Sequence, residues 1–303
     1  MIARPISFHS NSSVSVVQMA TGDQDSFNYV SLGSALTKNL VQVKEVSQAG
    51  DVNTLVVLNA SDQFVFMMDG DVLAGAKQNR VVNTSVLLSP KSKTFIPVSC
   101  VEQGRWRHTS LKFKDSKFVA SPKLRADKAR HVRENLRKHN SFDANQREVW
   151  DYVSQSQKLY DMSSPTSNLS DVFEKKEKDF DAFVQAFAAN PETNGMAIFI
   201  GSQLKALDIF NRREVYQEYF PKILRATAFE SFQHPSGTKV VGQKEAEFRM
   251  LDFLDRLKDD SAAWERFPGV GVGSEERFGL EEMEGFELSY NERLIHFTAL
   301  HTA

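Results

Sequence analysis

Hydrophobic residues in the first third of the chain are gathered in short runs rich in β-branched side chains, a pattern typical of β-strands. Strands are predicted at residues 13–19, 40–46, 54–58, 63–68, 80–88 and 94–102. Most of these runs are bounded by Asn, Asp, Gly or Ser. The Asp69-Gly70 pair that follows the fourth run predicts a hairpin turn. The N-terminal part is therefore expected to form a mostly antiparallel sheet or sandwich.

The middle of the chain has helical patterns. Helices are predicted at residues 121–139, 144–162, 169–189 and 214–232, and a strand pair at 196–200 and 204–209. The first helix carries seven Lys and Arg residues between Lys123 and Lys138, against Asp127 and Glu134 alone, and is expected to present a solvated basic face. Pro221 is expected to kink the last helix or to mark its boundary.

Strand patterns return at the C-terminal end. The glycine-spaced segment 269–274 is expected to form a tight strand bend, and residues 285–297 a hairpin that turns at Asn291-Glu292. We expect these strands to rejoin the N-terminal sheet, which gives an α+β fold with an all-β layer and a helical layer. The prediction is a single domain over residues 1–303, with a β-rich part (1–119), a mainly helical part with a short strand pair (120–260) and closing strands (261–303).

The composition excludes several classes of protein. Lys and Arg number 37 and Asp and Glu 39, and this net charge of −2 argues against wholesale binding of nucleic acid. The single cysteine, Cys100, excludes an intramolecular disulfide framework and a multi-cysteine metal site, and the seven scattered histidines lack metal-site spacing. The sequence has no apolar run of membrane-spanning length and no signal-peptide pattern, so we expect a cytoplasmic protein without a membrane span.

The densest polar cluster lies inside the apolar N-terminal region. It follows Asp69 and comprises residues 75–80 and Asn83, in which Lys77 and Arg80 supply positive charge and Gln78, Asn79 and Asn83 supply amide groups. Gly75 has no side chain, so a ligand or another backbone can approach it closely. The set suits an anionic or richly hydrogen-bonding small molecule such as a nucleotide or a sugar phosphate. The alternative is an exposed hairpin whose polar side chains tie down neighbouring loops.

A second cluster occupies residues 96–106. Alternation along a strand places Ile96, Val98, Cys100 and Glu102 on one face, so Glu102 is expected at the mouth of the core beside the thiol. A carboxylate there needs a partner, for which Arg105, Lys77 and Arg80 are the candidates. The same cations could activate Cys100 as a nucleophile, or Cys100 is a small buried hydrophobe. Trp106 either stacks on a base or belongs to the core.

Two further polar residues stand inside apolar runs. Asp208 is expected to point into a pocket or to cap the next helix, and His296 is expected to be a structural residue of a late strand.

The two clusters resemble the signature motifs of the ARPP domain family, whose name stands for ADP-ribosylglycohydrolase and rhodanese-phosphatase-superfamily-associated protein. The similarity extends to Asp69-Gly70 and to residues 195–210, 271–274 and 294–297, so it covers nearly the whole chain as one domain. The family is named for gene association with ADP-ribose-processing proteins, which implies a role in NAD- or ADP-ribose-linked metabolism or in conflict systems. The resemblance brings no catalytic residues with it.

Three functions are compatible with these residues. In the first, the protein binds or processes an ADP-ribose- or NAD-related nucleotide. Lys77, Arg80 and Arg105 would contact the pyrophosphate, and Glu102 and Asp69 would accept from ribose hydroxyls or act as a general base. Trp106 would stack on the adenine.

The second function is a non-catalytic scaffold or regulatory module, in which the polar motifs form an internal network that joins the sheet to the helices. The third is a hydrolase or transferase that depends on Cys100.

Overall fold

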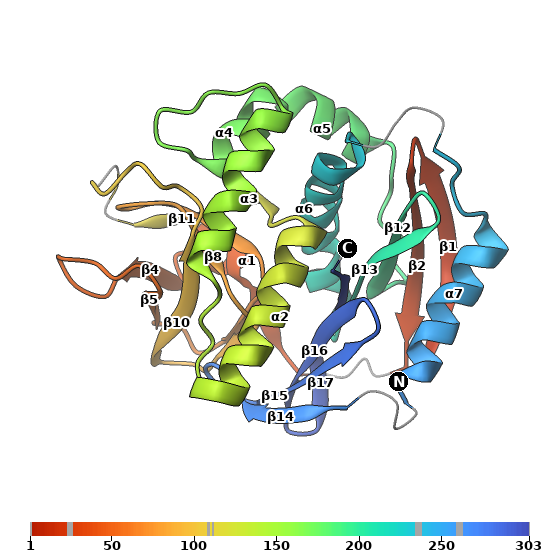
Figure 1. Cartoon of the computed structure of the whole chain (residues 1–303). Coiled ribbons are helices and arrows are strands. Elements are labelled where there is room, and N and C mark those ends of the chain that lie inside the picture. The colour runs from red at the N-terminus through yellow and green to blue at the C-terminus, as the bar shows by residue number, and fades with distance from the viewer. Residues whose placement is uncertain are drawn as a thin grey trace.

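The computed structural model describes residues 2–22, 27–107, 110, 112–233, 238–258 and 263–302. These residues form seven helices and 17 strands in mostly antiparallel sheets, which confirms the α+β fold class (Figure 1). None of the helices in these ranges is both long enough and apolar enough to cross a membrane.

The elements follow one another in three stretches. The first stretch contains β1 (Ala3–Asn11), β2 (Val14–Thr21), β3 (Tyr29–Ser31), α1 (Leu32–Thr37), β4 (Val41–Glu45), β5 (Thr54–Asn59), β6 (Phe64–Met67), β7 (Asp71–Gly75), β8 (Arg80–Val82), β9 (Val86–Leu88), β10 (Ser92–Cys100) and β11 (Phe113–Val119). The second contains α2 (Pro122–His139), α3 (Gln146–Leu159), α4 (Leu169–Lys175), α5 (Glu177–Gln185), β12 (Gly195–Ile200), β13 (Gln203–Phe210), α6 (Arg213–Ser231) and α7 (Gln243–Arg256). The third contains β14 (Glu265–Pro268), β15 (Ser274–Leu280), β16 (Met283–Tyr290) and β17 (Arg293–His301).

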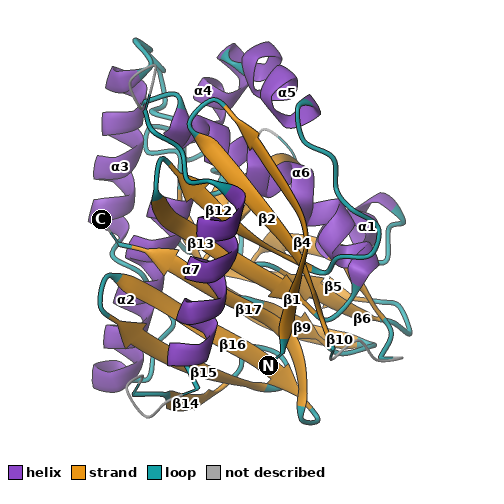
Figure 2. Ribbon diagram, turned by 90° about the vertical axis from the view of Figure 1, so that its right-hand side faces the viewer, coloured by secondary structure: helices purple, strands orange, loops and turns teal. Residues whose placement is uncertain are grey.

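The largest sheet is antiparallel and has eight strands in the order β1-β2-β12-β13-β17-β16-β15-β14. The C-terminal strands therefore rejoin the N-terminal ones, as expected, through the central pair β12–β13. Alternate residues of β12 enter different cores: Met196 and Ile198 face the interior, whereas Ala197 and Phe199 face α7. Figure 2 shows α7 lying across one face of this sheet, and α2 and α6 contact its other face.

Two smaller sheets complete the β part. One has the order β11-β7-β8-β10-β5-β4, and the other is β3-β6-β9, in which β3 and β6 are parallel. The hairpin predicted at Asp69-Gly70 is wrong, because β6 and β7 lie in different sheets. A turn does form there: Gly70 has a positive φ of 84°, and its N–H donates to Val82 O. The turn therefore carries the chain from one sheet to another.

The other predicted elements differ in detail. The run at 80–88 splits into β8 and β9, and the helix expected at 169–189 is divided into α4 and α5 at Lys176. Pro221 lies inside α6, which continues across it, so this proline marks no boundary. The C-terminal hairpin is confirmed: Asn291 and Glu292 turn between β16 and β17 with φ of 51° and 63°.

The basic helix is confirmed as α2, but two of its seven cations are buried and do not belong to a solvated face. Arg125 and Lys128 are each 2% exposed and lie on the same face as Ala129 and Val132. These two cations point into the interior, where α2 packs on β16 and β17. The prediction is wrong for these two residues, because the count of charges did not take account of the side of the helix on which each one lies.

Candidate functional site

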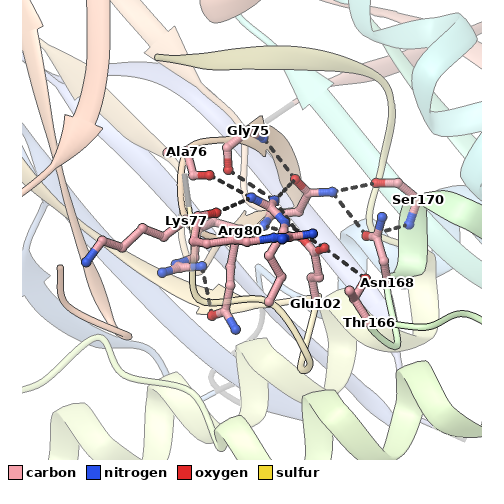
Figure 3. A network of polar contacts seen from close by, with 12 residues as sticks. Gly75, Ala76, Lys77, Arg80, Glu102, Thr166, Asn168 and Ser170 are labelled. Atoms are coloured by element: carbon pink, nitrogen blue, oxygen red, sulfur yellow. Dashed lines mark hydrogen bonds and ion pairs between the residues drawn. The ribbon is translucent and has the colours of Figure 1, made fainter. Parts of the chain in front are cut away.

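The residues of both sequence clusters meet where β7 and β10 end and β8 begins (Figure 3). Cys100 at the end of β10 pairs with Arg80 at the start of β8, and Glu102 makes an isolated bridge to Asn168 before α4. Gly75 ends β7 with a φ of 124°, and a Cβ there would lie 2.6 Å from Ser110 Oγ and 2.9 Å from Lys112 O. The close approach that Gly75 permits is thus made by the protein's own chain.

Glu102 is buried and has several donors around it. Arg105 binds it through Nε at 2.8 Å and Nη2 at 2.6 Å, the Thr166 hydroxyl donates at 2.9 Å, and the Asn79 backbone N–H donates at 3.1 Å. Burial alone would raise the pKa of Glu102, but these hydrogen bonds, led by those from Arg105, bring it below its usual value. The carboxylate is therefore held in its charged form as a structural anchor.

Arg105 is held by backbone and side-chain acceptors of the same region. Its Nη1 donates to Ala76 O at 2.6 Å and to Arg107 O at 3.1 Å, and its Nη2 also reaches Asn79 Oδ1 at 3.4 Å. Asn79 Nδ2 continues the chain of contacts to Asn168 Oδ1 at 3.0 Å and Ser170 Oγ at 3.2 Å. We refer to Asn79, Glu102, Arg105, Thr166, Asn168 and Ser170 as the signature network.

The other two predicted phosphate ligands are also occupied by the protein. Lys77 Nζ donates to Gln48 O and Ala49 O, both at 2.6 Å. Arg80, fully buried, donates to Gln78 Oε1 at 3.2 Å and lies 3.9 Å from a carboxylate oxygen of Glu45. Both cations lie beside the ring of Trp106, at 5.2 Å and 5.6 Å from its centroid, and this ring is 46% exposed.

Cys100 and Asn83 are enclosed in the same region. Burial raises the pKa of the Cys100 thiol to about 11, although Arg80 acts in the opposite direction, and the Sγ lies 3.6 Å from Val52 O. A nucleophilic cysteine needs a lowered pKa, so its surroundings are those of an inert thiol. Asn83 accepts from Ser99 Oγ at 2.9 Å and donates to Phe142 O at 3.1 Å.

Asp69 belongs to a different buried cluster, centred on Arg125. The Arg125 guanidinium binds Asp69 at 2.9 and 3.1 Å and Asp208 at 2.6 and 3.0 Å, and it also donates to Thr298 at 3.0 Å. His296 Nε2 lies 3.4 Å from Asp208, and its Nδ1 lies 2.9 Å from Ser85 Oγ. We refer to Asp69, Ser85, Arg125, Asp208, His296 and Thr298 as the central cluster.

The register of the large sheet explains how the central cluster forms. Asp208 on β13 pairs directly with Thr298 on β17, and His296 lies two residues away on the same inner face. Burial would raise the pKa of Asp208, but the charge of Arg125 keeps it far below its usual value. Asp208 neither caps α6 nor lines any pocket described here, so the expectation that it does one or the other is wrong: its carboxylate is buried in the ion pair with Arg125. His296 is buried in the same cluster, as expected of a structural residue. Arg125 is four and seven residues before Ala129 and Val132, so the helical pattern of the sequence places it on the same apolar face as these two residues.

A pocket of about 320 Å³ adjoins the signature network. Asn79 and Ser170 line it, and Phe118 and Phe173 form an apolar wall with ring centroids 3.6 Å apart. Its other lining residues are Ala74, Ser116, Lys117, Glu174, Glu177 and Arg225. Asn79 is thus the one residue of the predicted ligand-binding set that lines this pocket.

Comparison with known proteins places the whole chain in one family. The family model of the ARG and Rhodanese-Phosphatase-superfamily-associated Protein domain matches residues 4–300. The chain belongs to this family. Comparison with the curated proteins and with the solved structures found no significant match to either. The name ARPP links the domain, by association, to ADP-ribosylglycohydrolases and rhodanese-phosphatases.

Within this ARPP-family domain, four of the predicted site residues belong to the two buried clusters, and the others lie outside both. Glu102, Arg105 and Asn79 form the signature network, which reaches a pocket, whereas Asp69 lies in the central cluster. The sequence did not point to Arg225, which lines the pocket from α6, about 120 residues further along the chain than Arg105.

Proposed function

We propose that this ARPP-family protein binds a phosphate-bearing nucleotide of the ADP-ribose or NAD type in the pocket beside the signature network. The observation that carries the proposal is the Nε of Arg225, a buried donor with no hydrogen-bond acceptor among the residues that the structure describes. A buried N–H without an acceptor costs free energy, and a ligand phosphate oxygen supplies the missing acceptor.

The two amino groups of the Arg225 guanidinium are held by the protein itself. Its Nη1 donates to Lys117 O at 2.7 Å, and its Nη2 forms an ion pair with Asp181. Because both ends are fixed, little side-chain entropy remains to be lost when an anion binds to Nε. Lys117, 75% exposed at the rim and paired with Glu177 at 2.7 Å, is a second cation within the pocket.

Ser170, Phe118 and Phe173 suit the uncharged parts of a nucleotide, whereas Glu174 and Glu177 add two carboxylates to the lining. Ser170 Oγ accepts from Asn79, and its own hydroxyl proton has no acceptor among the described residues, so it is available to a ribose hydroxyl or a phosphate oxygen. The Phe118–Phe173 wall offers an apolar surface to a base. In this proposal Glu102 and Arg105 are positioning residues, which fix Asn79 and through it Ser170.

A scaffold or regulatory role is the second candidate. It is favoured by the internal pairing of Lys77, Arg80 and Arg105, whose charged groups are engaged with acceptors of the protein itself. Internally paired polar groups of this kind favour one arrangement of the surrounding elements, although the Nε of Arg80 has no acceptor among the described residues.

A binding experiment separates the two roles. Thermal shift and calorimetry would be run with ADP-ribose, NAD, AMP and inorganic phosphate on the parent, on Arg225→Gln and Ser170→Ala, and on Arg249→Gln as an exposed control from α7. A ligand at about 100 times its dissociation constant stabilises the fold by about 2.7 kcal/mol, a shift of several degrees. We expect ADP-ribose to bind the parent and Arg249→Gln equally, and at least about tenfold more weakly to the two pocket variants. Absence of binding by every nucleotide, or equal binding to all four proteins, would overturn the nucleotide proposal in favour of the scaffold.

A further inference from the structure

A second and larger pocket lies on the seam between α1, β11 and α6, with a volume of about 530 Å³. Glu218, Tyr219 and Lys222 line it from α6 and Asp115 from β11. Its other lining residues are Ser31, Gly33, Ser34, Thr37 and Lys38, which belong to α1 or flank it. None of these residues belongs to the signature network or to the pocket of Arg225.

The hydroxyl groups of this pocket use their protons within the protein. Ser31 and Ser34 donate to the Glu218 carboxylate, the latter at 2.8 Å, and Thr37 donates to Gly33 O at 2.9 Å. The Tyr219 hydroxyl donates to Asp71 Oδ2 at 2.7 Å. A hydroxyl has one proton and two lone pairs, so each of these oxygens can offer a ligand only an acceptor. The pocket therefore suits a ligand group that is rich in donors.

Two carboxylates and two lysines line this pocket, and the carboxyl of Asp71 lies behind Tyr219. Lys222 Nζ donates to both oxygens of Asp115, at 2.6 and 2.7 Å, while Glu218 has only hydroxyl partners among its described side-chain contacts. Behind Tyr219, Asp71 is 1% exposed and its Oδ1 has no partner among the described residues. Lys38, the other cation at the pocket, is exposed just after α1.

The pKa values of Asp71 and Asp115 are both raised, with burial as the largest cause. Burial raises the pKa of Asp71 to about 7; Lys222 lowers it and Asp115 adds to the rise. The pKa of Asp115 is raised by burial and by Glu218 against the effect of Lys222. A bound cation would relieve both carboxylates.

We propose that this pocket binds a small organic cation through a primary ammonium group, at a site separate from the nucleotide pocket. The ammonium would donate to Glu218 and to the lone pairs of Ser31 and Ser34. The described residues contain no group of three or more His, Cys, Asp or Glu side chains arranged to hold a metal ion, which favours an organic cation. Gly33 keeps the site open, because a Cβ there would lie 2.7 Å from Asp115 Oδ2.

The test is a calorimetric titration at constant ionic strength with four probes of similar size. These are butylammonium and 1,4-diaminobutane, with butan-1-ol as an uncharged control and tetramethylammonium as a cation without N–H donors. We expect saturable binding of the two amines and at least about tenfold weaker binding of both controls. Equal binding of tetramethylammonium, or no saturable binding of either amine, would overturn the proposal.

Matched variants locate the site. Glu218→Gln keeps an acceptor for the serine hydroxyls but removes the charge, and it is expected to weaken amine binding at least about tenfold. Gly33→Ala, which displaces the Asp115 carboxylate, should weaken it as well. Glu214→Gln, on the same helix and paired with Arg212 at an exposed position, is the control and should bind as the parent does. Unchanged affinity in Glu218→Gln with an intact fold would contradict the assignment. Arg225→Gln should leave amine binding unchanged, so the fates of the two proposed sites can be told apart.

Discussion

The central cluster and the signature network are both buried and both built around an arginine, but they differ in where their members come from and in what they reach. Arg125 is surrounded by Asp69, Asp208 and His296, which come from a loop and from two strands of the large sheet. Arg105 is paired with Glu102 only three residues away, and the network continues to Ser170 at a pocket. The first cluster joins layers of the fold, and the second holds one wall of a pocket.

The two clusters also differ in their ratio of carboxylates to guanidinium groups. We therefore expect the loss of the arginine to lower the free energy of unfolding by different amounts. In the central cluster one guanidinium serves two carboxylates, so its removal leaves both uncompensated. In the signature network one carboxylate faces one guanidinium, and backbone and hydroxyl donors remain if the guanidinium is lost. Breaking a buried ion pair costs far more than its formation gains, because the remaining charge stays desolvated.

The largest effect is expected for Arg125→Met. With Asp69 and Asp208 left without their cation, the free energy of unfolding should fall by at least about 3–5 kcal/mol, a large part of a typical total. Urea unfolding measures the loss, and Arg125→Lys, which keeps the charge but loses the fork of hydrogen bonds, should fall in between. Arg130→Gln, on the exposed side of the same helix, is the control. A midpoint in Arg125→Met equal to that of the control would refute the central role of this arginine.

A smaller effect is expected for Glu102→Gln. The substitution keeps the shape but removes the charge that faces Arg105, and hydrogen bonds to charged groups contribute about 1.5–3 kcal/mol. The same variant should weaken the proposed nucleotide binding, because Gln offers one acceptor oxygen to donors that share two in Glu102, and its NH2 group faces one of those donors. Chemical denaturation and calorimetry measure the two effects. If Glu102→Gln proves as costly as Arg125→Met, the proposed difference between the clusters fails.

Half of the signature network could be recognised in the sequence, because Asn79, Glu102 and Arg105 lie in two short polar segments. Residues 75–83 and 96–106 contain charged and amide side chains where sheet residues would be apolar, and strand alternation brought Glu102 to the core. The pairing of Glu102 with Arg105 was among the predicted partners, and it is the pair that forms. The hydrogen bonds from Asn79 to Asn168 and Ser170 depend on where α4 packs in the fold. A local sequence pattern does not predict that position.

The central cluster could be predicted only in part. Asp208 and His296 stood out as polar residues in apolar runs, but their partner Arg125 is 83 residues from Asp208 along the chain. The strand order of the large sheet, which makes Asp208 and Thr298 neighbours, follows from tertiary packing. The turn at Asp69-Gly70 misled for the same reason, since a local turn signal does not state which sheet the next strand joins.

Titration with acid distinguishes both clusters from Asp71. The pKa values of Glu102 and Asp208 are lowered, whereas burial raises the pKa of Asp71 to about 7. The charge of Lys222 lowers the pKa of Asp71, and the charge of Asp115 raises it further. Between about pH 4 and pH 7 the folded state therefore holds a proton on Asp71 that the unfolded chain has released. This group makes stability fall as the pH rises through that window.

Asp71→Asn removes this contribution and keeps an oxygen that can accept from Met68 N–H and the Tyr219 hydroxyl. We expect the variant to gain on the order of 1 kcal/mol relative to the parent between pH 5 and pH 8. Urea midpoints measured across this range give the comparison. A difference between the two proteins that does not depend on pH would mean that Asp71 is ionised throughout.

The smallest effect is expected for Arg137→Gln. This variant allows an exposed arginine and a buried arginine of the same helix, α2, to be compared. Arg137 pairs with Glu265 near the end of α2, at 44% and 26% side-chain exposure, whereas Arg125 at the start of the helix is buried. A surface pair contributes at most about 1 kcal/mol and is screened by salt, so Arg137→Gln should cost less than this and nothing measurable in about 1 M salt. The loss in Arg125→Met should persist at the same ionic strength, because a buried pair is screened much less. An Arg137→Gln loss that equals the Arg125→Met loss and resists salt would mean that α2 depends on its guanidinium groups regardless of burial. In that event the central cluster would have no special place in the fold.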